Sequence, residues 1–121
     1  MVEVRTYTEM LMFAEQNPRE CAVGETIFED GSPATEMYIV REGSVELRKG
    51  ATVLETLRAG EVFGEMALID PAPRSATAVA GEGCKLVVID EKTFNQLVQK
   101  VPGFALELMR TIVRRLRRAK A

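Results

Sequence analysis

Residues 63–80 read FGEMALIDPAPRSATAVA, and this stretch interrupts a chain that otherwise alternates like a β-protein. One glycine, one glutamate, two prolines and one arginine stand before the strand-like run SATAVA. The prolines prevent the segment from Glu65 to Arg74 from forming one long helix or one strand. We therefore expect one or two helical turns after Gly64, followed by an irregular return that ends at Arg74.

The segment from about residue 20 to residue 62 predicts a series of short β-strands. Apolar runs such as TIF, EMYIV and SVELR are separated by glycine-containing turns, and SVEL and TVLETL alternate between apolar and polar residues. This pattern is typical of a sandwich or barrel whose strands bury one face. The later runs SATAVA and CKLVVID complete the set, so we predict about eight short strands.

The last third of the chain predicts two helices. Asp90 is a suitable N-cap for a helix over EKTFNQLVQK, and Pro102-Gly103 separates it from a final helix, FALELMRTIVRRLRRA. The arginines of the final helix fall mostly on its polar face, where we expect them to be solvated. Its apolar residues predict one continuous stripe at spacings of three and four: Ala105, Leu108, Met109, Ile112, Val113 and Leu116.

The order of these elements indicates the fold class. Residues 6–16, TYTEMLMFAEQ, have the composition of a short helix that ends before Asn17-Pro18. We expect a mainly β protein with flanking helices: a double-stranded β-helix (jelly roll) at about 20–90, an N-terminal helix, and two C-terminal lid helices at about 91–119. All 121 residues fit one domain, 1–121.

Composition favours a binding module over an enzyme. The chain contains no histidine, which excludes Ser-His-Asp and Cys-His catalysis, the usual zinc sites and histidine-ligated haem. It also lacks the glycine-rich loops that bind dinucleotides and triphosphates. Cys21 and Cys84 are too few for a metal site, and we expect them to be buried free thiols. We therefore predict no catalytic cofactor and no metal.

Hydropathy and charge restrict the partners. No run approaches the roughly 20 apolar residues of a membrane span, and the N-terminus lacks an apolar signal core, so we expect a cytoplasmic location. After Glu107 the chain has six bases and no acids. A solvated helix face that matches the helix dipole explains these bases, and no aromatic residues are interleaved with them. We do not expect direct binding of nucleic acid.

The residues of the opening stretch have the chemistry of an anion site. Gly64 permits close approach of a ligand to the backbone, and the unpaired N–H groups at a helix start attract anions. Arg74 offers a planar fork of donors that matches phosphate oxygens, and Glu65 can accept from a sugar hydroxyl. This inventory suits a nucleotide with a singly charged phosphate, because a triphosphate would require more positive charge and a metal.

The pattern F-G-E-x-A-L followed by P-R-S-A-T resembles the phosphate-binding cassette of cyclic nucleotide-binding domains, the sensor module of catabolite activator proteins, cyclic-nucleotide-dependent kinases and cyclic-nucleotide-gated channels. GETIFEDGSPATEMYIVREGSVEL resembles the first roll of that family, and EKTFNQLV with the final helix resembles its lid helices. The resemblance spans roughly residues 20–118 and places the cassette at 63–77. It implies a jelly roll that binds cAMP or cGMP and is not an enzyme.

The resemblance also implies a role for each cassette residue. Arg74 would pair with the cyclic phosphate, and Glu65 would accept from the ribose 2′-hydroxyl. Ser75 holds the position where a hydroxyl can contact guanine, so the preference between cAMP and cGMP stays open. The complete set of expected ligand-binding residues adds backbone groups, residues that close the site and residues of its wall: Val62, Phe63, Gly64, Glu65, Met66, Ala67, Arg74, Ser75 and Ala76.

The sequence leaves open the residue that caps the base, the function of the chain and its oligomeric state. The base would be capped by a residue of the last helix, with Arg110, Arg114 and the apolar stripe as candidates. Ligand would draw the lid helices onto the roll and so regulate a partner protein or an effector domain outside this chain. The alternative is a nucleotide-blind scaffold or interaction module that uses its basic C-terminal helix. The apolar stripe could also pair two chains into a dimer.

Overall fold

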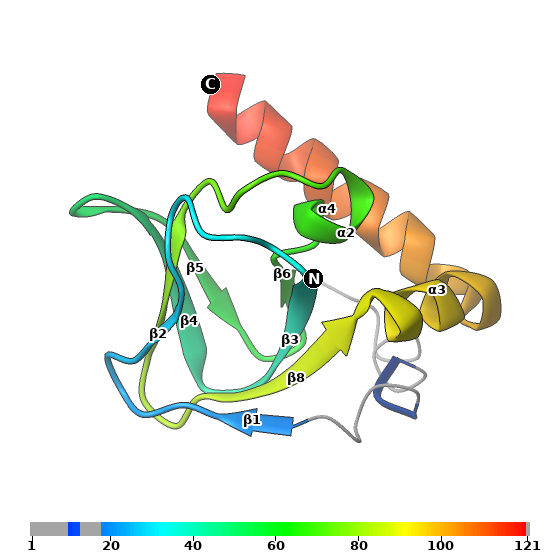
Figure 1. The fold of residues 1–121 in the computed structure, drawn as a ribbon, viewed down its shortest axis with the longest axis horizontal. Coiled ribbons are helices and arrows are strands. Elements are labelled where there is room, and N and C mark those ends of the chain that lie inside the picture. Colours follow the sequence, from blue (N-terminus) through cyan, green and yellow to red (C-terminus); the bar gives the residue numbers. More distant parts are fainter. Residues whose placement is uncertain (1–9, 13–17, 121) are drawn as a thin grey trace.

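The computed structural model describes residues 10–12 and 18–120, which form two antiparallel sheets followed by helices (Figure 1). Residues 10–12 are helical, and the rest of the helix predicted over 6–16 lies outside the described residues. The strands are β1 Pro18–Glu20, β2 Thr26–Phe28, β3 Glu36–Glu42, β4 Ser44–Lys49, β5 Thr52–Arg58, β6 Val62–Phe63, β7 Thr77–Ala80 and β8 Lys85–Asp90. The helices are α2 Met66–Ile69, α3 Glu91–Lys100 and α4 Pro102–Lys120. The predicted jelly roll with C-terminal helices is confirmed.

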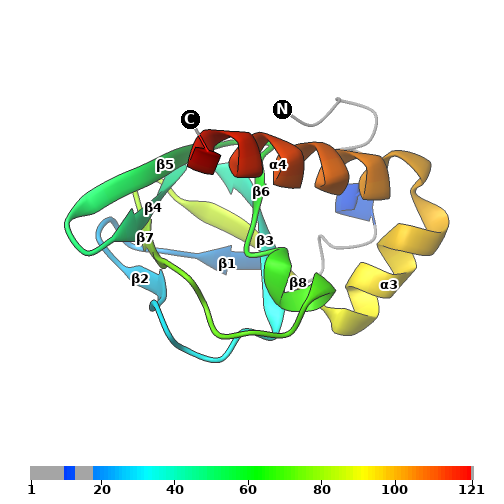
Figure 2. The ribbon, with the colours of Figure 1, turned by 90° about the horizontal axis from the view of Figure 1, so that it is seen from above.

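Helix α4 runs across the roll from the side of α3 to the side of β5 (Figure 2). The face of α4 that meets the roll carries the buried residues Phe104, Glu107, Leu108 and Thr111. Of the predicted apolar stripe, Leu108 is buried in this contact, whereas Met109, Val113 and Leu116 are 57%, 44% and 55% exposed. The partly buried Arg115 contacts a polar group of the roll, because its Nη2 donates to the Val62 carbonyl.

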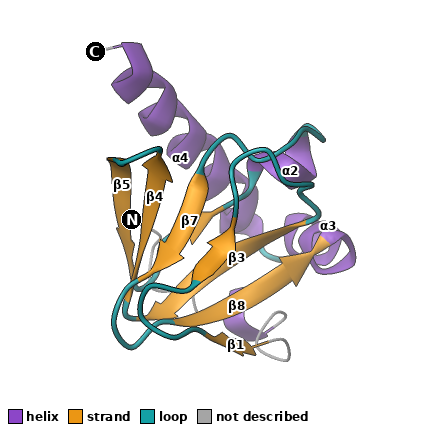
Figure 3. Ribbon diagram, turned by 60° about the vertical axis from the view of Figure 1, so that its left-hand side comes forward, coloured by secondary structure: helices purple, strands orange, loops and turns teal. Residues whose placement is uncertain are grey.

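Among the described strands the chain changes sheet at every connection except the one between β4 and β5, which are neighbours in one sheet. One sheet has the order β1-β8-β3-β6 and the other the order β2-β7-β4-β5 (Figure 3). Strand β3 pairs with β8 from Glu36↔Asp90 onward, and β4 forms a hairpin with β5. This arrangement brings β7, which directly follows Arg74, beside β4.

Strand β3 is buried on both faces from Met37 to Val40, which explains its unbroken apolar run MYIV. Tyr38 and Val40 belong to the cluster between the sheets, whereas Met37 and Ile39 pack in a second cluster beneath the helices. Such two-sided burial removes the alternation expected of a half-exposed strand.

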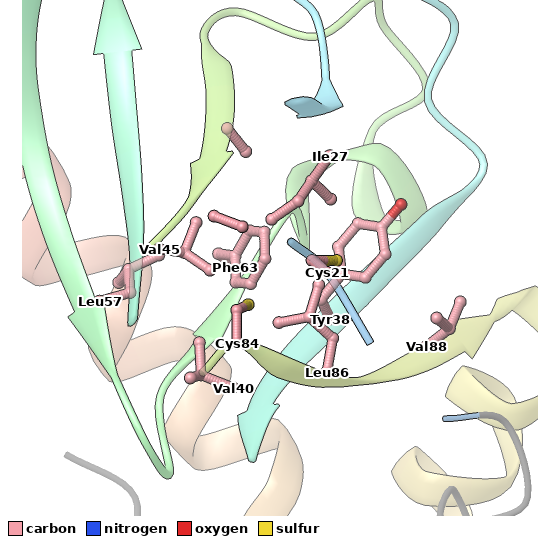
Figure 4. Close-up of a cluster of buried hydrophobic side chains, with 12 residues drawn as sticks. Cys21, Ile27, Tyr38, Val40, Val45, Leu57, Phe63, Cys84, Leu86 and Val88 are labelled. Atoms are coloured by element: carbon pink, nitrogen blue, oxygen red, sulfur yellow. The ribbon is translucent and has the colours of Figure 1, made fainter. Parts of the chain in front are cut away.

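The cluster between the sheets is rich in aromatic and sulfur-containing side chains (Figure 4). The rings of Tyr38 and Phe63 stack with their centroids 5.0 Å apart. Cys21 and Cys84 are buried free thiols, as expected, and burial raises the pKa of Cys84 to about 11. In the described part of the chain, no helix is long and apolar enough to cross a membrane.

Helix α3 begins where the sequence predicts. Asp90 occupies the N-cap in an extended conformation, and its Oδ1 accepts from the Thr93 backbone N–H at 2.8 Å. This hydrogen bond lowers the pKa of Asp90. The cap therefore stabilises the fold above the unfolded pKa of about 3.9, and its contribution is lost as pH falls through the lower folded value.

We predict that Asp90→Ala lowers the free energy of unfolding by about 1 kcal/mol at pH 7, because one N–H of the first turn loses its acceptor. Urea unfolding followed by circular dichroism measures the change. Asp90→Asn is the matched control, since asparagine caps without titrating and should keep most of the stability. If the difference in free energy of unfolding between wild type and Asp90→Ala were as large below pH 3 as at pH 7, the charge of Asp90 would not contribute to the cap.

Candidate functional site at the cassette

A cavity of about 560 Å³ opens between the 63–77 segment and the β4–β5 hairpin, against the C-terminal half of α4. Its volume lies in the range of small-molecule sites, about 300–1,000 Å³. Most of its walls are apolar, and the charged side chains that line it are Glu55, Glu65, Asp70, Arg74, Arg115 and Arg118. The cavity therefore combines an apolar surface with a few charged groups that could orient a ligand.

The cassette backbone is shaped by one glycine and by two contacts with the β2–β3 loop. Gly64 has φ +76°, a conformation that favours glycine, and a Cβ there would lie 2.9 Å from Arg74 Nη1, so a larger residue would displace the guanidinium. The Arg74 N–H donates to the Ser32 carbonyl at 2.9 Å, and the Gly31 N–H donates to the Arg74 carbonyl at 2.7 Å. The predicted helical turn is α2, which ends where Asp70 N–H donates to Met66 O.

Arg74 is a buried cation whose hydrogen-bond acceptors are neutral. Its side chain donates from Nη1 to the Gly64 carbonyl at 3.0 Å and from Nη2 to the Glu36 carbonyl at 2.6 Å, and the residue is 8% exposed. Its guanidinium carbon lies 4.0 Å from the centre of the Phe28 ring. Nε is buried and has no hydrogen-bond partner among the residues that the structure describes. Burial lowers the pKa of Arg74, yet arginine remains charged in proteins, so the cavity holds a positive charge that neutral carbonyls solvate incompletely.

Glu65 is held by the lid helix. Its carboxylate is 1% exposed and pairs with Arg115 Nη1. Arg115 also donates from Nη2 to the Val62 carbonyl at 2.9 Å and from Nε to Glu55 at 3.1 Å. The expectation that the arginines of this helix are solvated is therefore wrong for Arg115, whose side chain is 22% exposed.

The sequence contained one signal for Arg115 that the prediction did not use. Phe104, Leu108 and Thr111 are buried, and Arg115 continues their series at steps of four, three and four. Residues at these steps share one helix face. The same periodicity separates Arg115 from Arg114 and Arg117, which are exposed.

The remaining predicted residues divide into a cavity group and a supporting group. Gly64, Met66, Ser75 and Ala76 line the cavity. Val62 and Phe63 instead lie in the core behind it, and Ala67 lies within α2. From α4 the described lining consists of Arg115 and Arg118, and it includes neither Arg110 nor Arg114, the arginines named as candidate base caps.

Comparisons with known proteins agree with this geometry. The family model described as "Cyclic nucleotide-binding domain" matches residues 18–101. A cAMP-dependent protein kinase regulatory subunit of Schizosaccharomyces pombe is 38% identical over 88 residues, which are 72% of this chain and 20% of that protein. The chain spans less than two thirds of the length of such curated relatives.

Two solved structures superpose on nearly all of this chain. The catabolite activator protein of Thermus thermophilus superposes with a TM-score of 0.83 at 31% identity, over 98% of this chain and 57% of that one. A second structure, described as "A cyclic-GMP-dependent signalling pathway regulates bacterial phytopathogenesis", also has a TM-score of 0.83, at 30% identity, over 97% and 96% of the two chains. The family model matches most of the chain, and the solved structures superpose on nearly all of it. The chain therefore belongs to the cyclic nucleotide-binding domain family.

Proposed function

We propose that this chain is a sensor module that binds cAMP or cGMP in the cassette cavity and transmits binding through α4 to a partner or an effector domain. The observation that carries the proposal is Arg74, a buried cation in the cavity wall whose side-chain hydrogen bonds within the described residues go to neutral carbonyls. A cyclic phosphate, with one negative charge and exposed oxygens, would supply a charged partner for its guanidinium.

Glu65 supports the orientation of such a ligand. It lines the same cavity as Arg74 and is an acceptor when ionised, so a ribose hydroxyl could donate to it while the phosphate pairs with Arg74. Its present partner is Arg115 of α4. A sugar hydroxyl that donates to the Glu65 carboxylate, beside Arg115 or in its place, would change the contacts of α4. Occupancy of the cavity is thereby linked to the position of the lid helix.

We infer binding rather than catalysis, and a cytoplasmic location. The chain has no histidine for acid–base or nucleophilic chemistry at neutral pH. Its two cysteines are buried as free thiols, which is the usual state in a reducing compartment.

We predict that Arg74→Leu weakens binding of either cyclic nucleotide by about 30-fold to several thousand-fold, equivalent to about 2–5 kcal/mol, because the phosphate would be desolvated without its cation. Isothermal titration calorimetry of protein stripped of carried-over ligand measures the loss. Arg58→Leu is the matched control, since Arg58 is exposed and does not line the cavity. Equal affinity of Arg74→Leu and wild type would remove Arg74 from the site, and no binding by folded wild type would favour the nucleotide-blind scaffold.

We predict that Arg115→Met lowers the free energy of unfolding by about 2–4 kcal/mol, because it leaves the buried Glu65 carboxylate without its partner; the partial exposure of Arg115 keeps the effect below that of a fully buried pair. The double variant with Glu65→Gln should recover part of the loss. A double-mutant cycle by urea unfolding measures the coupling. Arg117→Met, at an exposed position of the same helix, should change stability by less than about 0.5 kcal/mol. Additive effects of the two substitutions would show that the pair is not coupled.

A second role is favoured by the outer face of α4. Leu106, Met109, Val113 and Leu116 are 46%, 57%, 44% and 55% exposed and follow one another at steps of three, four and three. This is the spacing of a two-helix seam, in which equivalent residues of two copies would bury one another. We propose that α4 pairs with a second copy of the chain.

We predict that wild-type protein at micromolar concentration sediments as a dimer and that Met109→Lys with Val113→Lys converts it to a monomer, because two charges would be buried in the seam. Sedimentation velocity measures the change. Val98→Lys, on the exposed side of α3, is the control for a general effect of added charge. A monomeric wild type would exclude the dimer.

A further inference from the structure

Glu55 is a charged residue at a position where the fold calls for an apolar one. It stands two residues before the fully buried Leu57 on β5, opposite Leu47 of β4. Residues two apart on a strand share a face, so Glu55 lies on the core-facing side of its sheet. Its side chain is 15% exposed and lines the cavity. A polar group on an inward face is informative, because burying it requires partners or a function.

Glu55 lies on β5, on the other side of β4 from the strand that follows Arg74. Strand β5 is separated from β7, the strand that follows Arg74, by the single strand β4 (Figure 3). Neighbouring strands lie about 4.8 Å apart, so β5 and β7 are about 10 Å apart. That spacing suits a nucleotide that lies across the sheet, with its phosphate at the cassette and its base at β5.

The carboxylate of Glu55 is oriented by two arginines of α4. Arg118 Nη1 donates to Oε1 at 2.7 Å and Arg115 Nε donates to Oε2 at 3.1 Å. Each carboxylate oxygen has two lone pairs, so both oxygens can accept one further hydrogen bond without losing their arginine. Arg118 also lines the cavity and has donor groups beyond the one used by Glu55.

These groups suit guanine better than adenine. Guanine presents two adjacent donors, N1–H and the N2 amino group, which match the two oxygens of a carboxylate, and its O6 is an acceptor that suits arginine. Adenine has a single amino group beside the ring acceptor N1, which a carboxylate repels. We propose that Glu55, held by Arg118, reads the base and makes the site prefer cGMP to cAMP. This inference rests on the proposed cyclic nucleotide site.

The first test compares three ligands on the wild-type protein by isothermal titration calorimetry: cGMP, cAMP and cyclic inosine monophosphate, which keeps O6 and N1–H but lacks the 2-amino group. The expected order of affinity is cGMP, then the inosine nucleotide, then cAMP. We expect cGMP to bind about 10- to 100-fold more tightly than cAMP, the range of one good bidentate base contact. This series requires no variant and so does not depend on the folding of a mutant.

The second test is Glu55→Gln, with thermal unfolding to verify the fold. We expect cGMP affinity to fall at least about tenfold while cAMP affinity changes less, so that the ratio of the two approaches one. Glu46→Gln is the matched control: Glu46 lies on β4, next to Leu47 in sequence, and pairs with Arg48 away from the cavity. It should leave the ratio unchanged.

The outcomes separate this inference from the proposed function. Binding of both nucleotides with cAMP tighter, or an equal loss for both in Glu55→Gln, would overturn base reading by Glu55 while the cyclic nucleotide site stands. Failure of folded wild-type protein to bind any of the three ligands would overturn the proposed function, and this inference with it.

Discussion

The structure of the cassette depends on how the charge of Arg74 is buried. In the described residues its hydrogen bonds go to two carbonyl oxygens, and one aromatic ring covers its guanidinium. Gly64 fits this arrangement, because its φ of +76° favours glycine and a larger residue would displace Nη1. The β2–β3 loop also contributes, because its hydrogen bonds with the Arg74 backbone hold that residue in place. A cation fixed this way is preorganised for an anion and requires little rearrangement when one arrives.

The second constraint is that α4 packs through polar groups as well as apolar ones. Phe104 and Leu108 anchor its first turns in the core, and Arg115 then pairs with Glu65 and Glu55, residues from two different parts of the roll. Buried ion pairs of this kind contribute modestly to stability compared with apolar packing, but they depend strongly on geometry. The C-terminal half of α4 is therefore held by contacts that a ligand can alter, whereas its N-terminal half is held by contacts that it cannot.

Local signals allowed most of the fold to be predicted. The strands, the turn α2 and the N-cap Asp90 are encoded by neighbours in sequence, through alternation, proline positions and capping chemistry. The contacts of Arg115 could not be predicted in the same way, because they join residues 50 and 60 positions apart. Which part of the α4 stripe is buried depends on the face that meets the roll, and that contact joins residues far apart in the sequence. Glu55 is a charged residue on the inward face of its strand, and only its partners on α4, Arg115 and Arg118, explain it.

The network around Glu55 gives the site a direct physical connection to the lid. Glu55, Arg115 and Arg118 line the cavity and also border a second, polar cavity of about 300 Å³, which Arg114 and Thr111 of α4 line as well. A ligand that engages both Glu65 and Glu55 would contact the two carboxylates that pair with Arg115 and hold the C-terminal half of α4. By linkage, any partner that binds the docked form of α4 better than the released form must change nucleotide affinity by the same factor. The direction of that change depends on whether the ligand adds to the arginine contacts or replaces them, and the free lone pairs of Glu55 favour addition.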